Sequence, residues 1–228
     1  RTITVVGDTR YSPQEVIGAS GISTGMNLVR LNTKKAKEAI QKKLPYAETV
    51  KISKKFPFDL VISVAEPTLV AAVQSGNQIY IISGQGRVLE EAESTAGYLV
   101  FEGLELTEGE NGLVVSDLKM LDRLVKVVKA IQAQQIEKVT MVRSSSSSDC
   151  TFIYDGRITV KLGSLDELEY KMKFASYLLA NKIRSDERGV LDATVPGEGK
   201  FNPENADEAQ PTQEDESVPS ASSAVSSG

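Results

Sequence analysis

The 228-residue sequence predicts an α+β protein with three parts: a small N-terminal domain at 1–66, a larger and mostly antiparallel β-domain with flanking helices at 67–203, and a disordered tail at 204–228. Up to residue 66, strand and helix patterns follow one another in the order β-α-α-β-β. From residue 67, short apolar runs separated by turn residues indicate hairpins, interrupted by two helical periodicities. The tail carries six acidic residues, no basic one and almost nothing to bury, so it cannot offset the entropy of ordering.

In the N-terminal domain the helices are marked by their end signals. Ser12-Pro13-Gln14-Glu15 has the pattern of a capping box with proline in the first turn, which predicts a short helix. Pro45 stops a second helix, because proline cannot continue one. The expected elements are a strand at 3–6, helices from 13 to about 18 and from 33 to 44, and strands at 50–54 and 60–64 around a turn at 55–59.

In the β-domain, turn residues and helical spacing set the expected elements. Asp155-Gly156 is a strong hairpin turn, because both residues tolerate positive φ. Ser116 is expected to cap one helix, and Ser164-Leu165-Asp166-Glu167 reads as a capping box that opens another. The expected strands lie at 69–73, 79–82, 88–89, 98–101, 139–142, 151–154, 157–162 and 190–195, and the helices at 117–135 and 165–184.

The composition argues against several classes of function. The chain contains no histidine, the commonest general base and metal ligand near neutral pH, and a single cysteine, Cys150, expected to be a small side chain in a strand. Without its tail the chain has a net charge of about +1, which does not suggest a nucleic-acid surface. We therefore expect no catalysis, cofactor, nucleic acid or small-molecule substrate.

Four local patterns have a structural interpretation that outweighs the functional one. Gly84-Gln85-Gly86 lacks the third glycine of a dinucleotide fingerprint and reads as a turn. Ser144–Ser148 reads as a flexible hairpin loop, and Glu108–Gly112 lacks the calcium-loop pattern. The basic helix residues are best explained as a solvated face, with an acidic partner or an anionic membrane surface as the alternative; they are Lys119, Arg123, Lys126 and Lys129.

The positive hypothesis concerns Val190–Val195, expected to be the last strand. A terminal strand often lies at a sheet edge, where unpaired N–H and C=O groups can accept a strand of another protein. An edge strand without a partner is equally compatible with the residues.

Several stretches, in this order and spacing, resemble one family. Phe58–Pro67 is similar to the last strand of a POTRA domain, and Tyr80–Leu89 to the opening of the β-domain of the FtsQ/DivIB cell division proteins. Thr159–Gly163 resembles that family's step before a helix, and Gly189–Asp192 its terminal strand. The resemblance covers about residues 1–203. Members often have Arg or Leu where this chain has Ala193 and Thr194.

The resemblance implies a non-catalytic divisome scaffold whose C-terminal edge strand binds FtsB (DivIC in Gram-positive bacteria) and FtsL. It also implies a single-pass type II membrane protein with this part outside the cell, at the division septum. The partner-binding residues implied by position are Asp192, Ala193, Thr194, Val195, Pro196, Gly197, Glu198, Lys200 and Phe201, with Arg143 as a weaker candidate. One alternative is a POTRA-containing secretion or membrane-protein assembly factor. The other is a cell-wall hydrolase, which the composition described above argues against.

Overall fold

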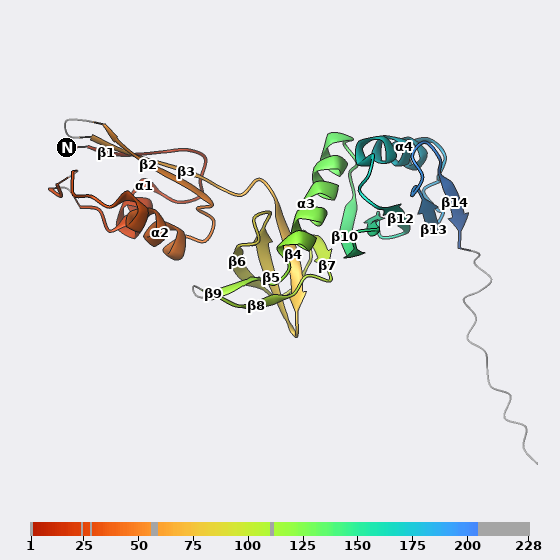
Figure 1. Cartoon of the computed structure of the whole chain (residues 1–228), viewed down its shortest axis with the longest axis horizontal. Coiled ribbons are helices and arrows are strands. Elements are labelled where there is room, and N and C mark those ends of the chain that lie inside the picture. Colours follow the sequence, from red (N-terminus) through yellow and green to blue (C-terminus); the bar gives the residue numbers. More distant parts are fainter. Residues whose placement is uncertain (1, 24, 28, 56–58, 110–111, 205–228) are drawn as a thin grey trace, which may run out of the picture.

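The computed structural model of the chain describes residues 2–23, 25–27, 29–55, 59–109 and 112–204. It shows a small α+β unit at one end and a larger sheet flanked by two helices (Figure 1). Two sequence predictions lie outside the described residues: most of the turn at 55–59 and all but the first residue of the tail.

The N-terminal unit is a three-stranded sheet covered on one face by two helices. In chain order its elements are β1 (Ile3–Val6), α1 (Pro13–Ser20), α2 (Thr33–Lys43), β2 (Thr49–Lys55) and β3 (Asp59–Ala65). β3 lies in the middle, parallel to β1 and antiparallel to β2. Ser12 and Glu15 form the predicted capping box in full. Buried side chains from the helices and the central strand form one core, which includes Val16, Ile40, Leu60 and Ile62.

The second unit is built on a nine-stranded mixed sheet in which antiparallel pairs outnumber parallel ones. Its strands in spatial order are β14 (Lys200–Pro203), β13 (Gly189–Asp192), β12 (Ile158–Gly163), β11 (Asp149–Tyr154), β10 (Val139–Ser146), β7 (Leu99–Glu102), β4 (Val70–Ser75), β5 (Gln78–Ser83) and β6 (Val88–Ala92). Asp155 and Gly156 both have positive φ, 54° and 65°, so the predicted hairpin turn between β11 and β12 is confirmed.

Two helices, α3 (Leu118–Ala133) and α4 (Leu168–Asn181), cover one face of this sheet. Their apolar stripes pack with the inward side chains of the strands into a single core, with Leu124, Phe152 and Met172 fully buried. Cys150 lies in the same core, as expected, and its thiol donates to the Ser144 hydroxyl at 3.4 Å.

Three local predictions in this unit were wrong. The side chain that caps α3 is Asp117, which accepts from the Met120 N–H, not Ser116. Ser164 caps no helix, because α4 begins only at Leu168, after an uncapped left-handed Glu167. The serine run is not a loop throughout: β10 continues to Ser146, and buried Ser144 accepts from Arg123.

The sequence also gave no sign of a two-stranded hairpin, β8 (Leu106–Gly109) and β9 (Gly112–Val115). A bridge between Val114 and Arg87 attaches this hairpin beside the start of β6. It therefore lies next to one edge of the nine-stranded sheet.

The two units are joined through a buried contact. Tyr46, just after α2, packs against Ile81 and Leu89 on the sheet face opposite the helices. The Arg87 guanidinium reaches from the start of β6 to the main-chain carbonyls of Gln41 and, at 3.0 Å, Ala47. A cation at the C-terminal end of a helix is favourable, because the last carbonyls there have no helical partner.

Candidate partner-binding edge

The outermost strand at the C-terminal end of the large sheet is β14, not the segment predicted from the sequence. Val190–Val195 was expected to be the edge strand. The strand there is β13, which lies between β12 on one side and β14 on the other. The chain's own residues thus already cover β13, so that part of the hypothesis is wrong. Among the described residues no strand lies outside β14, and the open edge has moved outward by one strand.

The register shows which backbone groups of β14 face outward. Glu204 N–H donates to Arg188 C=O at 2.9 Å, next to the paired residues Gly189 and Pro203. Hydrogen-bonded pairs alternate along an antiparallel ladder, so residues 200 and 202 also bond to β13 and Phe201 turns its N–H and C=O outward. Pro203 faces the same way but has no N–H to offer. The open edge therefore presents one complete donor and acceptor pair, at Phe201.

Close backbone contacts hold β14 in place. Gly189 has a φ of 151°, and a Cβ there would lie 2.2 Å from the carbonyl oxygen of Asn202 on β14. In the connection between the strands, a Cβ on Gly199 would lie 2.5 Å from Leu178 and 2.9 Å from Phe174, both on α4. Only glycine allows the backbone approach at Gly189, and the small Gly199 lets the connection pack against the side chains of α4 before the chain returns to the sheet. The Phe201 side chain then packs against the main core, opposite Leu191.

Of the sequence-predicted site residues, the first three have internal roles. Ala193 is 1% exposed and cannot meet a partner. The Asp192 carboxylate accepts from the hydroxyl of Thr194 at 2.7 Å and from its N–H at 3.0 Å. These two hydrogen bonds keep the pKa of Asp192 below its ordinary value, and they close the turn that ends β13.

The remaining predicted residues divide into accessible and distant ones. Val195, Pro196, Gly197 and Glu198 belong to the connection between β13 and β14, with Val195 51% exposed. Lys200 and Phe201 lie on β14 itself. Arg143 is on β10, four strands from β14, or roughly 19 Å at about 4.8 Å per strand. Its guanidinium lies 3.9 Å from the Glu102 carboxylate, so the structure does not bring Arg143 to the edge.

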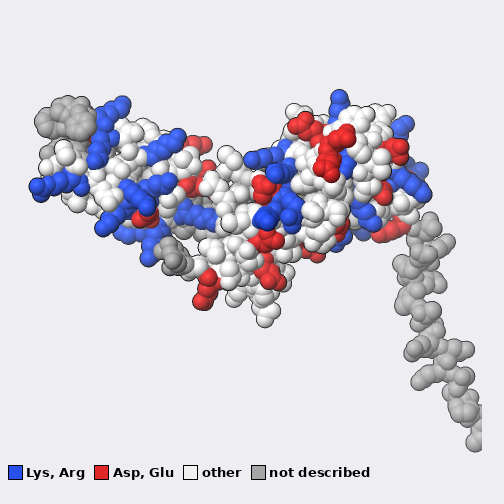
Figure 2. All heavy atoms as spheres, viewed as in Figure 1, with Lys and Arg blue, Asp and Glu red and all other residues white. Residues whose placement is uncertain are grey.

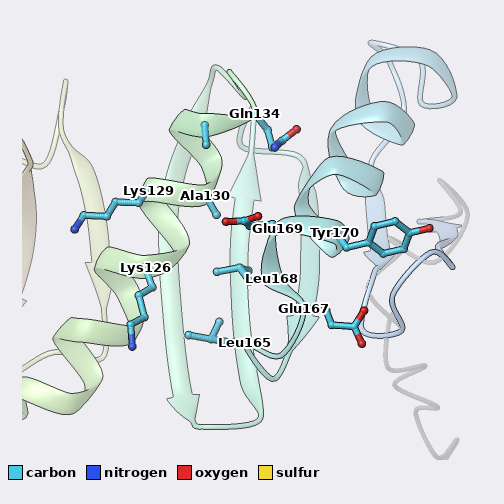
Figure 3. Close-up of a pocket in the computed structure, with 10 residues that line it drawn as sticks. Lys126, Lys129, Ala130, Gln134, Leu165, Glu167, Leu168, Glu169 and Tyr170 are labelled. Carbon is cyan, nitrogen blue, oxygen red and sulfur yellow. The ribbon is translucent and has the colours of Figure 1, made fainter.

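A hollow between α3 and α4 offers little for a small molecule. Leu165, Leu168 and Ala130 line it, and Glu169 lies between the helices (Figure 3). The other charged and aromatic side chains at its rim point away from it, as the figure shows for Lys126, Lys129, Glu167 and Tyr170. Because few polar groups converge there, the hollow lacks the orienting contacts that ligand sites have.

Within the described residues, no group of three or more acidic or cysteine side chains is placed to hold a metal ion. No helix among those residues is both long and apolar enough to span a bilayer.

Comparison with known proteins agrees with the two-unit structure. Residues 1–66 match the family model of the FtsQ-type POTRA domain, and residues 71–193 match that of the C-terminal part of cell division protein FtsQ/DivIB. β14 lies beyond the second match. The cell division protein DivIB of Clostridium botulinum strain Hall is 32% identical over 199 residues, covering 83% of this chain and 76% of that protein.

Two further relatives extend the comparison. DivIB of Clostridium acetobutylicum is 25% identical, covering 86% of this chain and 79% of its own. Cell division protein FtsQ of Streptomyces coelicolor is 24% identical, covering 85% and 75%.

Proposed function

The chain belongs to the FtsQ/DivIB family of cell division proteins, and from that premise we propose that it is a non-catalytic scaffold whose β14 edge accepts a strand of a partner protein. The partner we propose is an FtsB/DivIC-type protein acting together with FtsL. The observation that carries the proposal is the outward N–H and C=O of Phe201 on a strand with no described neighbour outside it. A partner strand would gain main-chain hydrogen bonds there, and side-chain contacts would give specificity.

The shape of the edge limits how the partner would bind. Pro203 removes one outward donor, so pairing is strongest at Phe201 and weakens toward the end of the strand. Lys200 and Asn202 point to the sheet face opposite Phe201 and are exposed. An acidic side chain on the partner strand would suit Lys200. We therefore propose Lys200 and Phe201, with the exposed part of the connection from Val195 to Glu198, as the contact surface.

We further propose that the protein acts at the division septum, attached to the membrane by a segment ahead of Arg1. The FtsQ-type POTRA match followed by the FtsQ/DivIB match favours this function over a secretion or membrane-protein assembly factor.

The proposal is tested by two substitutions at one position. Phe201→Ala removes the side chain and keeps the outward N–H, whereas Phe201→Pro removes both. Titrated with the extracytoplasmic part of a DivIC-type partner, Phe201→Pro is expected to bind about tenfold more weakly than Phe201→Ala. One interchain hydrogen bond contributes about 1–1.5 kcal/mol, and 1.4 kcal/mol corresponds to a factor of about ten.

Circular dichroism of both variants checks that the sheet is retained. Equal affinities for the two variants would remove the β14 backbone from the mechanism.

A further inference from the structure

The charge of this protein is divided unequally between its two units. Residues 1–66 carry eleven Lys and Arg against six Asp and Glu, a net charge of +5, although the whole chain has −5. Figure 2 shows the basic side chains spread over the N-terminal unit with few acidic ones among them, whereas the two signs mix over the β-domain. The N-terminal unit is therefore an electropositive module on an otherwise acidic protein.

The most exposed large apolar side chain among the described residues also lies in this unit. Val29, in the connection between α1 and α2, is 74% exposed, and nearby Met26 is 44% exposed. Arg30 follows Val29 directly and Lys34 lies in the first turn of α2, and both are exposed. In Figure 1 this connection lies at the end of the molecule furthest from the large sheet, the same end as the N-terminus. We call Met26, Val29, Arg30 and Lys34 the basic tip.

The basic tip has a defined conformation. Val29 N–H donates to the Asn27 side chain at 2.9 Å, and Arg30 N–H donates to the Asn27 carbonyl at 3.1 Å. Lys54 on β2 donates to the carbonyl of Leu31 at 2.9 Å, and the Leu31 side chain packs against the domain core. These contacts direct Leu31 inward and leave Val29 outside. Val29 is thus exposed between described residues, Asn27 and Leu31, that are held by hydrogen bonds.

We propose that the basic tip contacts the surface of an anionic lipid bilayer. An exposed apolar side chain flanked by cations suits the boundary between headgroups and acyl chains. Arg and Lys bind anionic headgroups while their aliphatic stems lie along the apolar layer. The six acidic residues of the unit leave it a net charge of +5, although one of them, Glu38, lies 4.0 Å from Lys34 of the tip.

With two apolar side chains and few cations, the contact is weak by itself. It would orient the protein on a membrane rather than anchor it. The inference goes beyond the proposed partner binding and uses none of its residues, so either can fail while the other holds.

The test is co-sedimentation of the full chain with lipid vesicles at low salt. We expect binding to vesicles containing phosphatidylglycerol, little to pure phosphatidylcholine vesicles, and loss of binding as salt is raised. Arg30→Gln is expected to weaken binding about fivefold, since one surface cation contributes about 1 kcal/mol. Val29→Asn is expected to weaken binding by at least about as much, because it removes the apolar side chain that would be buried at the boundary of the acyl chains. Both positions are exposed, so the fold is retained.

Matched controls lie at the start of α3. Leu118 is 64% exposed, and Lys119 follows it. Leu118→Asn and Lys119→Gln are expected to leave vesicle binding unchanged. Absence of binding to phosphatidylglycerol vesicles, or equal losses in the tip and control variants, would overturn the proposal.

Binding to a soluble polyanion distinguishes between two possible partners of the basic tip, a bilayer and an acidic macromolecule. We expect poly-aspartate binding to depend on Arg30 and not on Val29, whereas vesicle binding depends on both. Vesicle binding that is insensitive to Val29→Asn would assign the tip to an acidic macromolecule and overturn the membrane proposal.

Discussion

The two edge strands of the nine-stranded sheet, β6 and β14, have different surroundings. At the β6 edge, the β8–β9 hairpin bridges to Arg87, and the strand itself carries Glu90 and Glu91. The same region holds the N-terminal unit through Tyr46 and the Arg87 guanidinium. At the β14 edge, no described segment lies outside the strand. One edge thus contacts other parts of the molecule, whereas the described residues leave the other uncovered.

This contrast indicates how a sheet protein can be a selective adaptor. The two glutamates and the hairpin bridged at Arg87 discourage strand addition at β6, which limits uncontrolled edge-to-edge association. At β14 the edge is short and ends in Pro203, so it accepts pairing only over a few residues. Selectivity would come from protecting one edge and shortening the other.

The largest effect is expected from Gly189→Ala, which would remove the open edge altogether. The new Cβ would lie 2.2 Å from the Asn202 carbonyl oxygen, and φ there is 151°, so β14 must separate from β13. We expect a loss of at least about 3 kcal/mol in the free energy of unfolding, measured with urea.

In Gly189→Ala, partner binding should fall below detection. Faster hydrogen exchange confined to residues after 188 would locate the damage. Unchanged partner affinity in this variant would contradict the assignment of the edge to β14.

A smaller effect, at the opposite edge, is expected from Arg87→Met. The variant loses the hydrogen bonds to Gln41 and Ala47, and two partly buried carbonyls lose their donor. We expect about 2 kcal/mol of destabilisation, typical of a hydrogen bond to a charged group. Partner affinity should not change, because β14 is untouched. A parallel loss of partner affinity would show that the two edges are coupled.

The smallest effect concerns Tyr46 and appears only at alkaline pH. Burial, helped by the Glu90 carboxylate, raises the pKa of Tyr46 to about 12. The unfolded chain releases the same proton near pH 10. The contribution to stability is therefore complete below about pH 10 and is lost as the pH rises toward about 12.

The Tyr46→Phe variant should not show this loss of stability at alkaline pH. The difference in unfolding free energy between the two proteins, followed from about pH 8 to 11, isolates it from the other tyrosines. A difference in unfolding free energy that does not change with pH would mean that the contact between the two units does not bury the Tyr46 phenol.

Two similar sequence patterns show where sequence reasoning succeeds and fails. Ser12–Glu15 and Ser164–Glu167 both read as capping boxes, and only the first forms one. The buried Lys171 ammonium accounts for part of the difference. It donates to the carbonyls of Leu162 and Ser164, which holds the chain between β12 and α4 against the helix and places the helix start later. Capping is a local signal that a tertiary contact can override.

The candidate site shows the same limit. Val190–Val195 was predicted to be the last strand because a disordered tail was expected soon after it. The short return strand with the sequence Lys-Phe-Asn-Pro has little apolar alternation to reveal it. Phe201 was nonetheless among the predicted partner-binding residues because of family position. Arg143, the weaker candidate, lies four strands from β14, because neighbouring order in the sheet does not follow order in the chain.

The sequence by itself determined the two units, the type and approximate position of most of their elements, and the absence of histidine chemistry, because periodicity, turn residues and composition are local properties. The tertiary structure alone decided which strand is outermost, which carbonyls Arg87 reaches and which glycines permit close packing. These depend on contacts between residues far apart in the chain, where the free energy of packing and backbone pairing outweighs local preference.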